Sequence, residues 1–313
     1  MNITILGCGV YGLALADCFL QKNNNRVMVW NKFEKEILEV KEKYLGITFT
    51  TDMESAIKEA DLIVIAIPVA FLNSTVMEMK DLYKGQDILI ASKGIDVDSQ
   101  RLAFEIVKDI LPDCSLGVIS GGTFAKDMSE GNVMGLTLAT DSEIIKNKVK
   151  LTLENEFLRI QYISDIVGTS ICGAIKNVMA IGFGMLDGAM MPPSSRFLFL
   201  TEAIYEINDL IKELDGNNET IMSYAGLGDI MMTCTSSQSR NYTMGSLIGK
   251  NTSKERLTEY KKNNTIEGLG TTKAIYELAL KKDIDLPISN TIYNILYNDG
   301  SANDLIELLK KKA

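Results

Sequence analysis

The first half of the chain alternates short apolar runs with amphipathic stretches, and this alternation constrains the fold more than any other feature. Strands are expected at Ile3–Leu6, Arg26–Trp30, Asp61–Ile67, Asp87–Ser92, Ser115–Ser120 and Val133–Ala139. Helical periodicity lies between most of these runs, as at Val10–Gln21, Lys32–Lys43 and Ser99–Leu111. Repeated strand–helix units with apolar strands predict an α/β fold with a doubly wound, Rossmann-type parallel sheet and right-handed crossovers.

The second half has a different pattern. From about Asp165 onward the strand signals stop, and the remaining residues indicate long helices. Breaks between these helices fall at Met191-Pro192-Pro193, at residues 215–218 and at Asn263-Asn264. A chain of 313 residues is long enough for two domains. We therefore predict an α/β domain over residues 1–163 and an all-helical substrate and catalytic domain over residues 164–313.

Charge and hydropathy exclude several classes of partner. A net charge of −9 argues against nucleic acid and anionic membranes, because surfaces that bind them need a basic excess. No apolar run approaches the length expected of a membrane span, and Met1–Leu6 leads into a strand without a basic signal region. We therefore expect a cytoplasmic protein with no nucleic-acid partner and no membrane span, in which a few local groups bind any anion.

The chain contains no histidine. A Ser-His-Asp triad, a histidine base and an imidazole-bound metal are therefore excluded, and acid–base chemistry must use Lys, Asp, Glu, Tyr or Cys. The five cysteines, Cys8, Cys18, Cys114, Cys172 and Cys234, are scattered without CxxC spacing. This distribution predicts reduced thiols and neither disulfides nor a metal site. Lysine becomes the leading candidate for a general base.

A glycine-rich string, Gly7-Cys8-Gly9-Val10-Tyr11-Gly12, follows the first expected strand and opens the first expected helix. In this context GxGxxG is typical of dinucleotide binding. The first glycine permits a tight turn, the second lets the backbone approach a pyrophosphate, and the third lets helix pack on strand. A glycine-rich turn without a ligand is the alternative, but the position at the start of a βαβ unit favours the cofactor.

The residues after the second expected strand bear on the choice between NAD and NADP. Trp30-Asn31-Lys32 stands where NAD-specific proteins usually place an acid for the ribose hydroxyls. Lys32 could pair with a 2′-phosphate, or it could be a solvated loop lysine. Glu34 is nearby but is expected on the next helix. We predict NAD or NADP as the cofactor, with NADP tolerated.

A solitary lysine stands in a long apolar helix expected over Val167–Leu186. Lys176 is its only charged residue, and the helix also carries Gly168, Gly173, Gly182 and Gly184. These glycines reduce helix stability but permit close approach of another backbone or a ligand. Burial would lower the pKa of Lys176 toward that of a useful base. The alternative is a lysine whose amine reaches water.

A second polar cluster spans residues 226–241. Asp229 and Thr233 are four residues apart, so on a helix they share a face. Ser239-Arg240-Asn241 groups donors suited to a phosphate, which arginine can bind through two hydrogen bonds. The alternatives are a helix cap at Asp229 and a surface arginine at Arg240.

These strings together resemble the NAD(P)-dependent glycerol-3-phosphate dehydrogenase family of the bacterial type. The likeness covers nearly the whole chain: GCGVYGLALA near the N-terminus, IASKGI at 90–95, ISGGTFAKD at 119–127, AIKNVMAIGFG at 174–184, GLGDIMMTCTSSQSRN at 226–241 and IEGLGTTKAIYELA at 266–279. The resemblance implies a homodimeric enzyme of glycerophospholipid metabolism. It would interconvert sn-glycerol 3-phosphate and dihydroxyacetone phosphate with NAD(P) and without a metal.

The resemblance also assigns roles to single residues. Lys176, in IKN, matches a catalytic base that removes the hydroxyl proton as hydride leaves. Asp229 and Thr233 match positions beside that base, with the acid orienting the lysine and tuning its pKa. Lys93, in SKG, matches a lysine that contacts substrate and cofactor. The other matches are the phosphate binders Ser239, Arg240 (also near the cofactor) and Asn241, the positions Gly121, Thr123 and Ala125 below the nicotinamide, and the cofactor contact Glu267.

Several positions depart from the family's pattern. Ser120-Gly121-Gly122-Thr123 lacks the family's proline, the stretch from Asp187 to Arg196 is atypical, and Glu202 and Gly270 stand where arginines are common. These differences leave open a dehydrogenase that uses Pro192–Arg196 to select another phosphorylated hydroxy compound. A non-catalytic NAD(P)-binding sensor is a second alternative, against which the retained lysines and Asp229 weigh.

Overall fold

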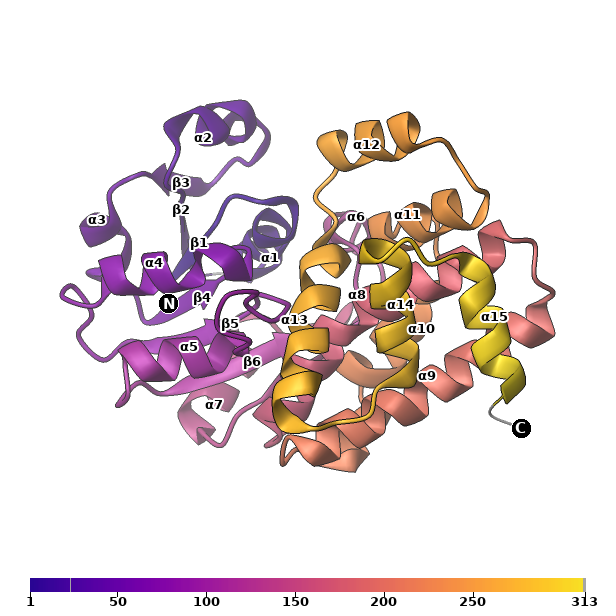
Figure 1. Ribbon diagram of the computed structural model, residues 1–313. Helices are drawn as coiled ribbons and strands as arrows, with labels where there is room; N and C mark the ends of the chain where they lie inside the picture. The colour runs from indigo at the N-terminus through magenta and orange to yellow at the C-terminus, as the bar shows by residue number, and fades with distance from the viewer. Residues whose placement is uncertain (23, 312–313) are drawn as a thin grey trace. The chain divides into compact units, whose positions relative to one another are not determined.

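The computed structural model describes residues 1–22 and 24–311, which form two compact units (Figure 1). Unit 1 comprises Met1–Lys93 and Ala103–Ile166, and unit 2 comprises Gly94–Leu102 and the chain from Val167 onward. The sequence did not suggest that a short segment between two strands would belong with the helical unit. The proposed division between residues 163 and 164 into two functional domains stays a prediction.

Unit 1 is built on an eight-stranded sheet in the order β3-β2-β1-β4-β5-β6-β7-β8. The first six strands are parallel and follow the order typical of dinucleotide-binding folds, so the predicted fold class is confirmed. The strands are β1 (Asn2–Leu6), β2 (Arg26–Trp30), β3 (Ile47–Thr50), β4 (Leu62–Ile65), β5 (Asp87–Ile90), β6 (Leu116–Ser120), β7 (Met134–Ala139) and β8 (Leu158–Ile163).

The sheet differs from the prediction at its two ends. β3 and β8 were not predicted: β3 is short and mostly half-buried, and β8 alternates apolar with polar residues at the sheet edge. β7 runs antiparallel to β6, with Ile119 opposite Leu138, and β8 then runs parallel to β7. The hydropathy pattern of a strand does not depend on its direction in the sheet, so the sequence pattern could not predict this reversal.

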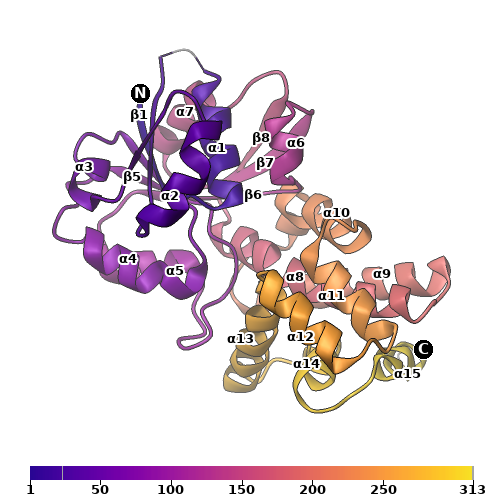
Figure 2. The same ribbon diagram turned by 90° about the horizontal axis from the view of Figure 1, so that it is seen from above.

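Helices cover both faces of the sheet (Figure 2). Alternate side chains of one strand enter different cores: Leu62 and Val64 join one, and Ile63 and Ile65 join the other. Burial on both faces explains the continuous apolar runs. The helices are α1 (Val10–Leu20), α6 (Ala125–Ser129) and α7 (Glu143–Thr152) in the first core, α3 (Met53–Ile57), α4 (Leu72–Met79) and α5 (Ala103–Ile110) in the second, and α2 (Glu34–Val40) after β2.

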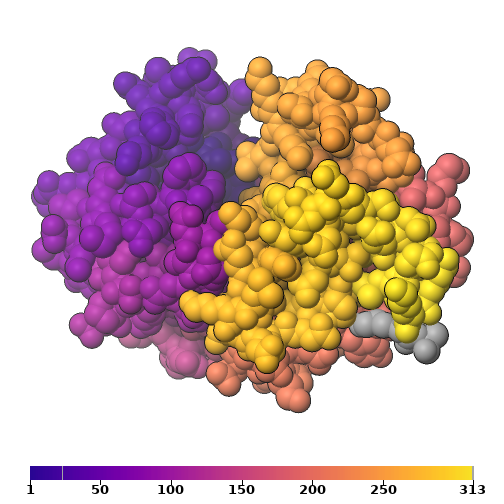
Figure 3. Space-filling model, in the orientation of Figure 1, coloured from indigo at the N-terminus to yellow at the C-terminus, as the bar shows by residue number. Residues whose placement is uncertain are grey.

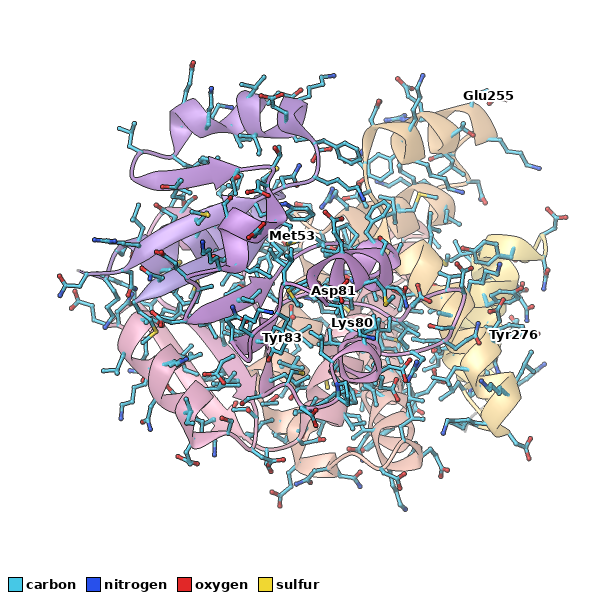
Figure 4. All side chains as sticks on the ribbon, turned by 90° about the vertical axis from the view of Figure 1, so that its left-hand side faces the viewer. Met53, Lys80, Asp81, Tyr83, Glu255 and Tyr276 are labelled. Carbon is cyan, nitrogen blue, oxygen red and sulfur yellow. The ribbon has the colours of Figure 1, made fainter. Side chains whose placement is uncertain are left out.

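Unit 2 is helical and has the long α8 (Ile166–Gly188) as its core helix. The helices after it are α9 (Pro193–Glu213), α10 (Asp229–Thr235), α11 (Arg240–Gly249), α12 (Lys254–Asn263), α13 (Glu267–Lys282), α14 (Pro287–Tyr297) and α15 (Ala302–Lys311). The space-filling view shows the C-terminal helices, in yellow, on the surface of this unit (Figure 3). Tyr276 of α13, labelled in Figure 4, stacks on Tyr293 of α14 with ring centroids 3.8 Å apart.

The core helix α8 is long and apolar enough to cross a membrane by length and composition, which differs from the prediction that no run approaches that length. However, 83% of its most apolar window is buried inside the protein. Burial in a core explains this composition without a bilayer.

Glycines bring α8 and α11 into backbone contact. A Cβ on Gly184 would lie 2.2 Å from the Tyr242 carbonyl oxygen, and one on Gly188 would lie 2.2 Å from that of Ser246. In the reverse direction, a Cβ on Gly245 or Gly249 would lie 2.0 Å from a carbonyl oxygen of α8. Since real side chains do not approach so closely, all four positions need glycine for this packing.

A buried carboxylate joins α9 to α14. Glu206 is 4% exposed, and its oxygens accept hydrogen bonds from the backbone nitrogens of Ile288 (2.6 Å) and Ser289 (2.9 Å) and from the Ser289 hydroxyl (2.7 Å). These nitrogens lie in the first turn of α14, where helices leave N–H groups without partners and a negative charge is favourable.

We expect Glu206→Ala to lower the free energy of unfolding by about 2 kcal/mol, because it leaves buried donors without an acceptor. Urea-induced unfolding measures the loss. The control is Asp209→Ala, which removes an exposed carboxylate from the same helix and should change stability little. Equal stability of the two variants would show that the Glu206 cap does not stabilise unit 2.

Candidate active site

The glycine loop of unit 1 has the geometry that a pyrophosphate requires. Gly7 has a φ of +117°, and its N–H donates to the Trp30 carbonyl at 2.8 Å. A Cβ on Gly12 would lie 2.3 Å from the Gly7 carbonyl oxygen, so only glycine lets α1 pack against the loop. At Gly9 a Cβ would meet nothing within 4 Å. The open side of Gly9, at the N-terminus of α1, therefore leaves room for a phosphate and fits a dinucleotide.

A further predicted residue, Lys93, lies beside this loop. The Lys93 Nζ lies 4.8 Å from the centroid of the Tyr11 ring, a cation–π distance that brings the lysine of the SKG motif to the start of α1. Val10 is 72% exposed at the first position of α1. The structure therefore places Lys93, Val10 and Tyr11 together in unit 1, and the contact between Lys93 and Tyr11 was not predicted.

The loop after β6 contains buried hydroxyl groups without partners. Ser120 Oγ and Thr123 Oγ1 make no hydrogen bond within the described chain, although the residues are only 2% and 7% exposed. A Cβ on Gly121 would lie 2.7 Å from the Gly135 carbonyl oxygen, so this glycine packs directly on β7. Ala125 begins α6. Buried hydroxyls without partners are rare, and in such folds ligands bind beyond the carboxyl ends of parallel strands. Sequence reasoning missed Ser120.

In unit 2 the central feature is a buried ion pair. Lys176 is 6% exposed on α8, and its Nζ donates to Asp229 Oδ1 at 2.5 Å. Asp229 is fully buried at the first position of α10, and Thr233, one turn later, donates its hydroxyl to the same oxygen at 3.1 Å. Lys176 therefore does not reach out to solvent, and Asp229 orients its amine.

The Cys234 thiol lies next to this pair. Burial raises the pKa of its thiol, the Lys176 ammonium opposes that rise, and Asp229 adds to it. The thiol therefore stays protonated at neutral pH and is a poor nucleophile or base. Lys176 remains the group in this cluster suited to moving a proton.

A chain of side-chain hydrogen bonds connects α8 to α11 and α13. Asn177 donates to Glu267 Oε2 at 3.1 Å and accepts from the Asn241 side-chain amide at 2.9 Å. The Asn241 oxygen in turn accepts from the Gly268 N–H at 2.9 Å. The sequence placed Asn241 and Glu267 in the site but missed Asn177. Its position directly after Lys176 in the IKN motif was the available signal.

The three predicted phosphate binders differ in the hydrogen bonds that their side chains already make within the protein. The Ser239 hydroxyl accepts from the Tyr242 N–H at 3.2 Å and so caps α11. Asn241 is buried and engaged in that chain of hydrogen bonds, whereas Arg240 is exposed and its guanidinium makes no hydrogen bond or ion pair within the described residues. Of the three side chains, Arg240 is therefore the one available to an incoming anion.

The atypical stretch from Asp187 in α8 to Arg196 in α9 contributes to a polar junction. Tyr242 donates its hydroxyl to Asp187 Oδ2 at 2.5 Å, and Arg196 forms an ion pair with Oδ1 of the same carboxylate. The tyrosine pKa is raised to about 12 by burial and by Asp187, so the hydroxyl remains a donor. The end of α8, the start of α9 and the first turn of α11 are therefore joined beside Arg240.

Lys32, the predicted contact for a 2′-phosphate, lies at the end of β2. Its Nζ is 3.6 Å from Glu78 Oε2 of α4, and both side chains are largely exposed. Among residues 1–22 and 24–311, no group of three or more Cys, Asp or Glu side chains is placed to hold a metal ion.

Comparisons with known proteins cover the whole described architecture. Residues 2–145 match the profile of the NAD-dependent glycerol-3-phosphate dehydrogenase N-terminus, and residues 165–307 match that of its C-terminus. The glycerol-3-phosphate dehydrogenase [NAD(P)+] of Wigglesworthia glossinidia brevipalpis is 36% identical over 314 residues, covering 95% of this chain and 94% of that protein. The glycosomal NAD(+) enzyme of Trypanosoma brucei rhodesiense is 32% identical, covering 95% and 89%.

Solved structures agree with these matches. The glycerol-3-phosphate dehydrogenase of Coxiella burnetii superimposes with a TM-score of 0.92 at 27% identity, covering 98% of each chain. The enzyme of Saccharomyces cerevisiae, at 22% identity and a TM-score of 0.84, shares the fold and covers 99% of each chain.

We expect Asp229→Asn to lower the free energy of unfolding by about 3 kcal/mol, because it leaves the buried Lys176 ammonium without a counter-charge. The double variant Lys176→Met with Asp229→Asn removes both charges and should recover most of that loss. Urea-induced unfolding of the three proteins measures the difference. A single variant as stable as the parent would contradict a charged pair.

Proposed function

The chain belongs to the NAD-dependent glycerol-3-phosphate dehydrogenase family and is an oxidoreductase of that activity, and we propose that Lys176 is its general base. Membership confirms the resemblance, the enzyme class and NAD(P) as the cofactor, and it sets the sensor alternative aside. The observation that carries the Lys176 proposal is its buried pair with Asp229, with Thr233 on the same oxygen.

The proposed chemistry moves one proton and one hydride. In the reduction of the ketone, the Lys176 ammonium donates its proton to the substrate oxygen as hydride reaches C2. In the reverse direction the ammonium first releases a proton to solvent, and the neutral amine then accepts the proton of the C2 hydroxyl as the C2–H bond breaks and a carbonyl forms. Bound NAD(P) supplies the hydride acceptor or donor. Asp229 accepts a hydrogen bond from Nζ throughout, so it aims the remaining N–H groups and the lone pair of the amine. Thr233 holds the carboxylate in place.

We propose that Arg240 is the side chain that binds the substrate phosphate. Arg240 is the first residue of α11, and its guanidinium makes no hydrogen bond or ion pair within the described residues. Both observations support this role. The backbone N–H groups of the first turn and the helix dipole add to the attraction for a dianion. Ser239 and Asn241, matched to phosphate binders by the family, act mainly by capping α11 and by fixing it to Asn177.

The proposed cofactor contacts lie on the glycine loop and the neighbouring loops. Gly7, Gly9, Val10, Tyr11 and Gly12 surround the pyrophosphate, as the open side of Gly9 indicates. Gly121, Thr123 and Ala125 line the nicotinamide side, where the hydroxyls of Ser120 and Thr123 are donors without partners in the described chain. The remaining proposed contacts are Lys93, Arg240 and Glu267, which follow the family match, and Lys32, which follows from its place after β2.

The alternative substrate depends on the segment Pro192–Arg196. Arg196 forms an ion pair with Asp187, so the structure gives no support to a second substrate contact there.

We propose a cytoplasmic homodimer, and the five buried free cysteines support a reducing compartment. Sedimentation of the purified protein decides the oligomeric state.

We expect Lys176→Ala to lower the turnover number roughly a hundredfold to ten-thousandfold, because a positioned general base contributes about that much. Lys176→Met, which fills more of the space, should lose a similar amount. Absorbance at 340 nm with dihydroxyacetone phosphate measures turnover, and NADH titration followed by fluorescence shows that the cofactor still binds. Near-normal turnover in both variants would reject Lys176 as the base.

We expect Arg240→Ala to lower catalytic efficiency with dihydroxyacetone phosphate by at least about tenfold, because a hydrogen bond to a charged group contributes about 1.5–3 kcal/mol. Efficiency with unphosphorylated dihydroxyacetone, already very low, should change little. Both substrates are measured at saturating reduced cofactor. An equal loss with both substrates would show that Arg240 does not bind the phosphate.

A further inference from the structure

The residue that follows β2 uses its whole side-chain amide inside the protein. Asn31 is 8% exposed, and its Oδ1 accepts from the Cys8 N–H at 3.4 Å. Its Nδ2 donates to the Phe33 carbonyl at 3.1 Å and to Glu36 Oε2 at 2.9 Å. Asn31 stands where an acid would contact the ribose, but its polar atoms are engaged, and one of them orients Glu36.

Glu36 is therefore fixed beside the glycine loop. It lies on α2, and its Oε2 is 3.9 Å from the Sγ of Cys8, the second residue of the glycine loop Gly7–Gly12. Its other carboxylate oxygen, Oε1, makes no hydrogen bond or ion pair within the described chain. Burial and then Glu36 raise the pKa of the Cys8 thiol to about 11, which is consistent with a carboxylate at this loop. An acidic oxygen is thus available near the end of β2.

We propose that Glu36 replaces the missing acid after β2, accepts the ribose hydroxyls of NAD(H) and repels the 2′-phosphate of NADP(H). The inference rests on the glycine loop being the dinucleotide site, and it makes this enzyme prefer NAD(H). An acidic group near the end of β2 recognises the ribose of NAD in this fold, because it accepts from the hydroxyls and is repelled by a phosphate. Glu36 reaches this place from the following helix because Asn31 holds it there.

The neighbouring charges favour the same outcome. Lys32 follows Asn31, and its Nζ lies 3.6 Å from Glu78 of α4, an exposed pair that costs little to break. Lys35, next to Glu36 on α2, has an exposed side chain. Glu39 also acts on the Cys8 thiol from α2. A 2′-phosphate near Glu36 would therefore meet the carboxylates of Glu36 and Glu39 as well as Lys32, whose ammonium already has a partner.

Calorimetric titration with NADH and with NADPH tests the proposal without turnover. The parent protein should bind NADH at least about tenfold more tightly than NADPH. Glu36→Gln keeps an acceptor for Asn31 but removes the charge, and it should narrow the ratio of dissociation constants by about tenfold, which corresponds to about 1.4 kcal/mol. Asn31→Ala removes the hydrogen bond that orients Glu36, so it should also reduce the preference for NADH over NADPH. Glu42→Gln makes the same change of charge at an exposed position, and it should leave the ratio unchanged.

The outcomes separate this proposal from the site on which it rests. If neither nucleotide binds the parent protein, the glycine loop is not the dinucleotide site. If both bind equally, or if Glu36→Gln leaves the ratio unchanged while both still bind, Glu36 does not select the cofactor. If only Lys32→Met changes the ratio, by weakening NADPH, Lys32 is the selecting residue and the proposal is wrong.

Discussion

The backbone contact between α8 and α11 is the constraint on which the helical unit depends. At Gly184, Gly188, Gly245 and Gly249 there is no room for a side chain, so the two helices have one spacing and one register. α8 carries Lys176 and Asn177, and α11 carries Arg240 and Asn241 in its first turn. The proposed base and the proposed phosphate binder are thus held on helices that cannot slide past each other without a clash.

Hydrogen bonds also fix α8 against α11, in addition to the glycine contacts. The amide of Asn177 bridges to Asn241, and Tyr242 is held by Asp187 at the end of α8. Each of these hydrogen bonds is buried or half-buried, where a lost partner costs about 1–3 kcal/mol. The backbone contact at the four glycines therefore sets the spacing of α8 and α11, and the hydrogen bonds prevent rotation of one helix against the other. A general base and a phosphate binder both need such positioning, because catalysis is lost steeply with small displacements.

Much of this arrangement could be predicted from the sequence, for identifiable reasons. The first strand–helix unit was correctly located because its apolar run, glycines and helix are consecutive, so local chemistry is sufficient. The edge strands β3 and β8 were missed because half-buried strands carry a weak signal. The direction of β7 and the placement of residues 94–102 with unit 2 depend on contacts distant in sequence. Asn177 and Glu36 were missed for the same reason, since their importance comes from Asn241, 64 residues away, and from Cys8, 28 residues away.

The short segment Gly94–Leu102 has a consequence for how the protein can be divided. Because it belongs to unit 2, the chain passes between the units at Lys93/Gly94, at Leu102/Ala103 and at Ile166/Val167. A fragment ending after the last strand would keep Gln100 but lose Glu277, to which Gln100 donates at 2.9 Å in the intact chain. One cut therefore cannot release either unit whole. Joining two separate modules end to end does not produce this connectivity, and a chimera of two relatives keeps unit 2 from one parent only if residues 94–102 and the helical half come from that parent.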